Sequence, residues 1–210
     1  MQTLHDYAER TLAAYRTHAR AAIASWRRSR RPSQGLRRFA ARLPAGARVL
    51  DYGCGIGTDL AWMRAQGFEV EGIDGTAAFV EEAKRRCPGA PIHCARFEEV
   101  PLASGRYDGI WSHAALMHVP LDVLRRQLKK LSRALRPGGV LGVTLAWGRR
   151  RTFTRRDWIP DRYVAAYSKA EGGAFFEGWS TQHLGVGSHD GRHGRWIYVL
   201  ASRPPTPTAS

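Results

Sequence analysis

Three glycines alternate with other residues directly after a short apolar run. Gly53, Gly55 and Gly57 follow the segment 49–51, and the residues from Thr58 onward have helical character. Glycine lets the backbone turn tightly and lets a ligand approach without a Cβ in the way, and the first turn of a helix offers free N–H groups. At the carboxyl end of a parallel strand, this arrangement predicts the site of a nucleotide-like ligand.

A carboxylate ends the next apolar run along the chain. Asp74 closes the segment 70–73, and an acid after the second strand can accept hydrogen bonds from a ribose diol. Because Asp is also favoured at the N-cap of a helix, a purely structural role is the alternative interpretation. The position after the second strand favours the ribose role.

Alternating strand and helix patterns must position these residues. Strands are predicted over 48–51, 68–73, 91–95, 107–112 and 140–146, and helices over 58–66, 76–86 and 119–135. Five strands with intervening helices imply a parallel sheet covered on both faces. A last strand, 196–200, is expected to pair with 180–184 as an antiparallel hairpin at the sheet edge.

The two ends of the chain have a different character. Helices are predicted over 3–29, which Pro32 stops, and over 33–42. The segment 148–161 is basic and without a regular pattern, and a short helix is expected over 168–176. The tail 204–210 contains Pro205 and Pro207 and is expected to be disordered.

The spacing of the glycines separates two kinds of ligand. The dinucleotide fingerprint is G-x-G-x-x-G, whereas this chain has G-x-G-x-G with Asp51 two residues before the first glycine. This pattern resembles motif I of the class I S-adenosylmethionine methyltransferases, in a small bacterial subgroup. Three further segments, 96–101, 107–120 and 131–141, resemble the adenine-edge segment, motif IV and the "L-RPGG" segment of that family. The resemblance covers residues 46–146 well.

The resemblance implies a fold and a domain plan. The expected fold is an α/β, doubly wound, mostly parallel seven-stranded sheet of the Rossmann-like methyltransferase type with an N-terminal helical lid. Residues 1–44 would form the lid, 45–203 the S-adenosylmethionine-binding domain, and 204–210 the disordered tail.

The resemblance also implies which residues bind the cofactor, S-adenosylmethionine. The expected set is Asp51, Gly53, Gly55 and Gly57 at the methionine part, Asp74 at the ribose, Gly75, Thr76, Phe97 and Glu98 at the adenine, and Ser112 and His113 at the methyl-transfer side, with Cys54 of the glycine loop also in the set. One position departs from the family. Many relatives carry Gly-Asp where this chain has Ala95-Arg96, and because arginine cannot accept a hydrogen bond, Glu98 is expected to take the adenine amino contact.

Methyl transfer chiefly requires alignment, because the sulfonium already activates the methyl group. Positioning can contribute about 7–11 kcal/mol, and a general base about 10²–10⁴-fold. His113, at the carboxyl edge of motif IV, is the candidate base, whereas His118 is expected to pack or hydrogen-bond near a helix start. The acceptor pocket is expected to use Tyr15, Trp26, Trp147 and Tyr163, which could hold a cation or a flat acceptor. Ordinary core packing is the alternative for these aromatic residues.

Composition bounds the remaining possibilities. The 210 residues are 43% hydrophobic, which suits one domain with a sizeable core. The formal net charge is +15, with arginines concentrated in 10–48 and 149–156. Such patches either form a solvated basic surface or bind phosphates. The three cysteines form no CxxC pair, no metal-ligand pattern is found, and no membrane span or secretory signal is expected, so a cytoplasmic location is predicted.

Three functions follow from these observations. The favoured one is a methyltransferase acting on a small-molecule acceptor. The alternatives are an RNA (tRNA or rRNA) methyltransferase using the basic patches, and a cofactor-binding protein without catalysis. The sequence leaves the acceptor atom and the oligomeric state open.

Overall fold

The computed structural model describes residues 4–28, 32–187 and 195–203. The chain begins with two helices, α1 (Leu4–Trp26) and α2 (Gln34–Ala40). The alternating part comprises β1 (Arg48–Tyr52), α3 (Thr58–Ala65), β2 (Glu69–Asp74), α4 (Ala77–Arg86), β3 (Ile92–Cys94), β4 (Tyr107–Ser112), the 3₁₀ turn η1 (Leu116–His118), α5 (Leu121–Ala134) and β5 (Leu135–Trp147). The last part comprises β6 (Arg151–Phe153), β7 (Tyr163–Tyr167), α6 (Lys169–Ala174), β8 (Ser180–Gly187) and β9 (Trp196–Ser202).

The sheet confirms the doubly wound, mostly parallel fold. Strands β3, β2, β1, β4 and β5 lie side by side in that order and run parallel. Strand β9 runs antiparallel to β5 and carries β8 at the outer edge, so the predicted hairpin is confirmed. The predicted disorder of 204–210 concerns residues outside the described part of the chain.

The described sheet has nine strands, where the resemblance implied seven. The two extra strands, β6 and β7, come from the region after β5, part of which was predicted to be irregular. Strand β7 pairs in parallel with Ala146 and Trp147 at the very end of β5. Because β9 already pairs with Ala146, β7 occupies the other edge of β5, beyond the end of β4. The addition therefore extends the sheet at its carboxyl edge.

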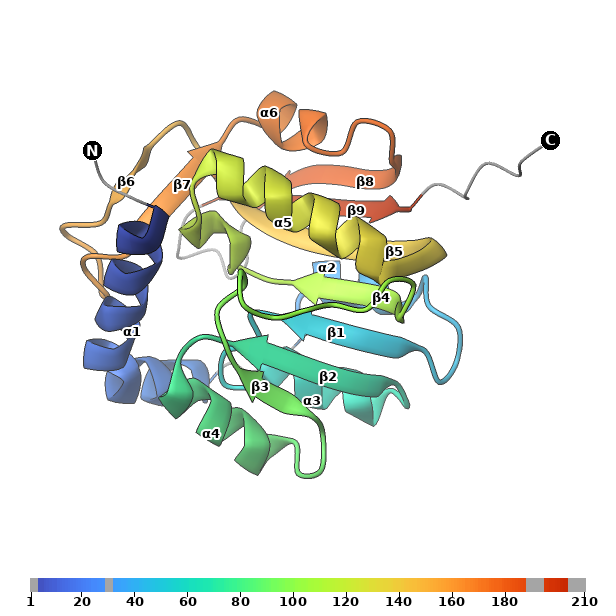
Figure 1. Cartoon of the computed structure of the whole chain (residues 1–210), viewed down its shortest axis with the longest axis horizontal. Helices are drawn as coiled ribbons and strands as arrows, with labels where there is room; N and C mark the ends of the chain where they lie inside the picture. The colour runs from blue at the N-terminus through green and yellow to red at the C-terminus, as the bar shows by residue number, and fades with distance from the viewer. Residues whose placement is uncertain (1–3, 29–31, 188–194, 204–210) are drawn as a thin grey trace.

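Amphipathic helices cover both faces of the sheet. Helix α5 buries an apolar stripe at three- and four-residue spacing against one face, and Figure 1 shows it crossing that face. Helices α2, α3 and α4 pack with Val49 and Trp111 on the other face. Helix α1 lies at the edge toward which the arrowheads of β1, β2 and β4 point (Figure 1). It contacts α4 and β7 there, so it covers the carboxyl edge of the sheet.

None of the described helices combines the length and the apolar character that crossing a bilayer would need.

Candidate functional site

The glycine loop between β1 and α3 has a backbone that only glycine adopts readily. The φ angles are +89° at Gly53, +52° at Gly55 and +74° at Gly57. A Cβ at Gly53 would lie 2.2 Å from the Cβ of Ala115. The same atom at Gly55 would meet nothing closer than the Trp26 ring at 3.8 Å. Gly53 therefore brings the loop against the turn after β4, while Gly55 faces α1.

Asp74 ties this loop to the end of β2. Its Oδ2 accepts a hydrogen bond from the N–H of Gly55 at 2.9 Å, and its Oδ1 accepts one from the N–H of Thr76 at 2.8 Å. Burial raises the pKa of Asp74, and these two hydrogen bonds oppose the rise. A carboxylate has about four acceptor sites, so the structural role and the predicted ribose role are compatible.

Two buried oxygens flank the loop without a partner. In the described part of the chain, Asp51 Oδ2 and Thr58 Oγ1 are buried and make no hydrogen bond. Burial, together with the charges of Asp59 and Asp74, raises the pKa of Asp51 well above its ordinary value. A buried polar atom left unpaired costs about 1–3 kcal/mol. An ammonium and a carboxylate at these positions would satisfy both atoms, which fits the amino-acid end of the expected cofactor.

The expected adenine side lies on the other flank of the loop. The Phe97 ring stacks on Tyr52 with centroids 4.4 Å apart, and it lies 3.4 Å from the position of a Cβ on Gly53. The Phe97 carbonyl accepts hydrogen bonds from Tyr52 Oη (3.0 Å) and Lys130 Nζ (2.6 Å), so its position is fixed. Glu98 is exposed.

The other predicted residues on this side face α1 or the interior. Arg96 forms ion pairs with Glu9 of α1 and with Glu99, so it connects this segment to the helix. A Cβ at Gly75 would lie 2.7 Å from Leu12 of α1. Cys54 is buried, and burial raises the pKa of its thiol well above the ordinary value. The Cys54 thiol is therefore a neutral, interior group of the glycine loop.

The end of β4 holds the two predicted methyl-transfer residues. Ser112 is fully buried, and its hydroxyl donates to the carbonyl of Tyr52 at 2.8 Å. His113 Nδ1 lies 3.0 Å from Thr144 Oγ1, and its ring stacks on Trp111. Ala114 follows with φ +53°, and its N–H donates to the same Thr144 oxygen at 2.7 Å. Thr144 therefore holds a left-handed, non-glycine turn at this edge, a conformation that is typical of functional sites.

A buried polar chain that sequence reasoning missed joins α1 to η1 and β7. His118 Nδ1 lies 2.7 Å from the carbonyl oxygen of Tyr163, and Nε2 lies 2.8 Å from Tyr15 Oη. Arg162, only 7% exposed, donates to the same hydroxyl at 3.0 Å and pairs with Asp157. Since a carbonyl cannot donate, Nδ1 carries the proton, and Nε2 accepts the Tyr15 proton.

The environment of His118 keeps the ring neutral. Burial is the main cause and the positive charge of Arg162 adds to it, and together they lower the pKa of His118 to about 4. Burial also raises the pKa of Tyr15. The prediction that His118 packs or hydrogen-bonds near a helix start fits this placement, since α5 begins at Leu121, but both hydrogen-bond partners are distant in the sequence. Sequence reasoning missed Arg162, because arginines are seldom buried. Thr11 and Tyr15 lie four residues apart on an otherwise apolar helix face. This spacing could have predicted that the face of α1 makes buried polar contacts.

Two of the four predicted pocket aromatics meet beside the glycine loop. Tyr15 and Trp26 both pack on Phe79, with ring centroids 5.6 Å and 5.0 Å away, and Trp158 lies 5.9 Å from Trp26. Trp158 is 45% exposed, so the cluster reaches the surface.

The other two predicted pocket aromatics lie elsewhere. Tyr163 offers its carbonyl to His118, while its ring packs on Tyr7. Trp147 lies at the end of β5 with the Arg195 guanidinium over its ring.

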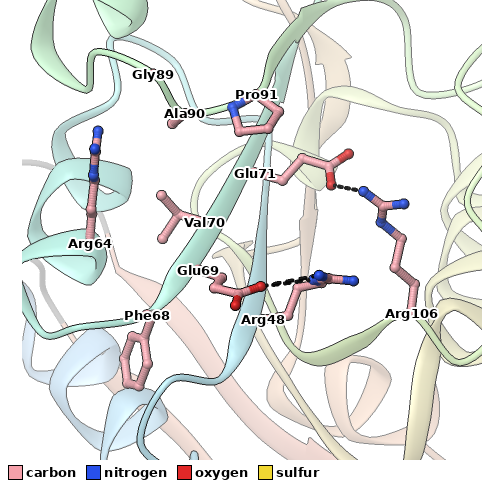
Figure 2. A pocket seen from close by; sticks show the side chains of 10 residues that line it. All are labelled: Arg48, Arg64, Phe68, Glu69, Val70, Glu71, Gly89, Ala90, Pro91 and Arg106. Atoms are coloured by element: carbon pink, nitrogen blue, oxygen red, sulfur yellow. Dashed lines mark hydrogen bonds and ion pairs between the residues drawn. The ribbon is translucent and has the colours of Figure 1, made fainter.

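A cavity of about 290 Å³ lies at the opposite, amino edge of β1 and β2. Figure 2 shows two ion pairs along it, Arg48 with Glu69 and Arg106 with Glu71. The strands begin here, so this cavity is remote from the glycine loop, which lies at the other end of β1. The two arginines are also neutralised by their ion pairs. The ligand-binding edge of a doubly wound sheet is the carboxyl edge.

Comparison with known proteins gives a consistent picture. Residues 49–139 match the family model described as a methyltransferase domain. The chain is 42% identical over 106 residues to a malonyl-[acyl-carrier protein] O-methyltransferase of Enterobacter lignolyticus, covering 50% of this chain and 41% of that protein. It is 33% identical over 129 residues to a dTDP-4-amino-2,3,4,6-tetradeoxy-D-glucose N,N-dimethyltransferase of Saccharopolyspora spinosa, covering 60% and 47%.

The fold extends beyond these matched segments. The structure of the Burkholderia thailandensis 1,6-didemethyltoxoflavin-N1-methyltransferase, with bound 1,6-didemethyltoxoflavin and S-adenosylhomocysteine, superposes with a TM-score of 0.76 at 17% identity. The alignment covers 97% of this chain and 92% of that one. By contrast, the chain spans less than half the length of the two curated relatives.

Proposed function

Because the chain carries a class I S-adenosylmethionine-dependent methyltransferase domain, we propose that it transfers a methyl group from this cofactor to a small-molecule acceptor. The observation that carries the proposal is the glycine loop between the buried Asp51 and the half-buried Asp74, with unpaired oxygens on Asp51 and Thr58 in the described part of the chain. When bound, the cofactor supplies a methyl group already activated by its sulfonium.

Residues of the loop and its flanks would hold the cofactor. Asp51 Oδ2 would accept a hydrogen bond from the ammonium group of the cofactor. Thr58 Oγ1 and the N–H groups of the first turn of α3 would donate hydrogen bonds to its carboxylate. Asp74 would accept from the ribose hydroxyls, and Phe97 would border the adenine. The sequence prediction of Glu98 as the adenine amino acceptor is kept as part of this proposal.

The acceptor would lie under α1, which acts as the lid. Tyr15, Trp26 and Trp158 would exclude water and orient the acceptor, and Arg162 with His118 would fix the Tyr15 hydroxyl. His118 is too weakly basic in this buried setting to be our candidate base. We retain His113 in that role. Its Nε2 would take the proton in the tautomer whose Nδ1–H donates to Thr144 Oγ1.

The two named relatives support a small acceptor group, in one case carried on an acyl-carrier protein, but they differ in the atom that is methylated. One is named for an O-methyl acceptor and the other for an N-methyl acceptor. Both oxygen and nitrogen therefore belong in the acceptor screen.

Calorimetry with S-adenosylhomocysteine tests the cofactor site. Wild type should bind, and Asp74→Asn should bind about 10- to 100-fold more weakly, because hydrogen bonds to a charged group are worth about 1.5–3 kcal/mol. Glu69→Gln, an exposed acid at the amino edge, is the matched control and should bind like wild type. Absence of heat with folded wild type would refute the proposal.

Transfer of tritium from labelled cofactor separates the possible acceptors. Label in the low-mass fraction of a metabolite extract is the expected result. Cofactor binding without any transfer would instead identify a protein that binds the cofactor without catalysis.

An RNA acceptor is the second candidate, and one observation favours it. Several arginines of the two basic segments are exposed, namely Arg37, Arg38, Arg149, Arg150, Arg155 and Arg156. Label incorporated into tRNA or rRNA in the same experiment, with none in the low-mass fraction, would establish this candidate and reject the first.

A further inference from the structure

A cavity of about 400 Å³ lies between α5 and the segment that follows α6. Leu128, Phe175 and Trp179 supply its apolar lining, and Ser132 lies on the α5 side. The two rings are fixed, since Phe175 packs edge-on against Tyr167 at 4.9 Å and Trp179 packs against Phe176 at 5.8 Å. The cavity is therefore a preformed apolar recess on the outer surface of α5.

Three cations stand in a row beside this recess. Arg125, Lys129 and Arg133 also line the cavity, are exposed, and recur every four residues. With a helical rise of 1.5 Å per residue, the row is about 12 Å long. None of the three pairs with an acid in the part of the chain that the structure describes, whereas their neighbour Arg126 pairs with Asp122.

We propose that this recess and its three cations, the α5 groove, dock an acidic amphipathic helix of a partner protein. Acidic side chains at the same four-residue repeat would meet the three cations. An apolar side chain between them would fill the recess beside Leu128 and Trp179. The proposal does not depend on methyl transfer.

The observations favour a protein helix over a nucleic acid. Phe175 and Trp179 are held by neighbouring rings, so they form walls and are not free to swing out and stack on bases. The depletion of acids along α5 supplies the charge complementarity that steers such encounters. Glu177 is the one exposed acid on the segment beyond α6 that borders the groove.

Fluorescence anisotropy with a labelled helical peptide tests the groove. The probe carries Glu at every fourth position and one Leu on the same face. Its affinity should fall about tenfold or more in a variant combining Arg125→Gln, Lys129→Gln and Arg133→Gln, since exposed ion pairs each contribute modestly. The matched control, Arg37→Gln with Arg149→Gln and Arg155→Gln, removes the same charge elsewhere and should retain the affinity. Replacing the peptide Leu by Ser should also weaken binding.

Four results would overturn the proposal. The first is that wild type does not bind the peptide. The second and third are an equal loss of affinity in the two triple variants and equally tight binding of a scrambled peptide of the same composition, and each of these would leave only bulk charge. The fourth concerns a nucleic acid. A single-stranded oligouridine that binds more tightly than the peptide, and that only the α5 variant releases, would mark the groove as a nucleic-acid site. Circular dichroism of both variants checks that the fold is intact.

Discussion

At the scale of single residues, His118 is a base that the fold holds neutral. Its ordinary pKa is 6.5, and burial beside Arg162 lowers it to about 4. As the pH falls below 6.5, the unfolded chain takes up the proton before the folded chain does. The folded state therefore loses stability between pH 6.5 and pH 4, by on the order of 3 kcal/mol in total, and the loss is complete below the folded pKa.

This argument predicts a shallower pH dependence in His118→Asn. The amide nitrogen of Asn can still donate to the Tyr163 carbonyl, so the variant should fold, while its side chain cannot titrate. Urea unfolding from pH 7.5 to pH 4 should show wild type losing more free energy of unfolding than the variant. His18→Asn, at a half-buried imidazole of α1, is the control and should follow wild type. Parallel curves for wild type and His118→Asn would show that the ring does not titrate as proposed.

Gly53 is a residue where a single added methyl group should disrupt the glycine loop. Gly53→Ala would place a Cβ 2.2 Å from that of Ala115 in a left-handed backbone. Gly46→Ala has nearly the same backbone strain, φ +68°, but nothing within 4 Å. A left-handed alanine costs about 1–2 kcal/mol. Gly46→Ala should lose about that amount in denaturant unfolding, and Gly53→Ala clearly more. Equal losses of unfolding free energy in the two variants would mean that the turn after β4 moves away from the new Cβ without destabilising the fold.

At the scale of elements, α1 is joined to the body of the protein by polar contacts. Tyr15→Phe removes the hydroxyl that Arg162 and His118 share, and should lower stability by about 1–3 kcal/mol, because buried groups lose their partner. The looser helix should also let S-adenosylhomocysteine associate faster, as measured by stopped-flow tryptophan fluorescence. Tyr7→Phe, on the same helix with its ring stacked on Phe153, is the control. An unchanged association rate in Tyr15→Phe would argue against α1 as a lid.

The elements also show where sequence reasoning succeeds. The glycine loop, Asp74 and the stop after α5 are local signals, and the structure places each where the pattern predicts. Strand β7 is different, because its formation depends on pairing with the end of β5 and on Thr11, which accepts the Tyr163 N–H. The contact between Thr11 and Tyr163 joins residues 152 positions apart, and the paired residues of β5 and β7 are 20 positions apart. A local sequence pattern therefore does not predict either contact. The polar chain of Tyr15, His118 and Arg162 was not predicted for the same reason.

At the scale of the whole molecule, the two halves of the site differ in how they are encoded. The glycine loop and Asp74, which we propose hold the cofactor, lie within 26 residues, 49–74, of the matched domain. The proposed acceptor side combines α1, η1 and the segment before β7, and two of these three lie outside residues 49–139. Similarity within the matched domain therefore carries little information about the acceptor. Changes in the flanking elements can alter the acceptor without touching the loop.

The excess of positive charge belongs to the molecule as a whole and predicts weak polyanion binding. With 33 basic and 18 acidic side chains, bulk tRNA should bind at low salt whatever the reaction is. Counterion release then implies an affinity loss of about 10³–10⁵ between 50 and 200 mM salt if six to ten phosphates are contacted. Filter binding measures this slope, and negligible retention at physiological salt is the expected result for a small-molecule enzyme. Tight, salt-resistant binding would require contacts beyond charge, and would favour the RNA acceptor.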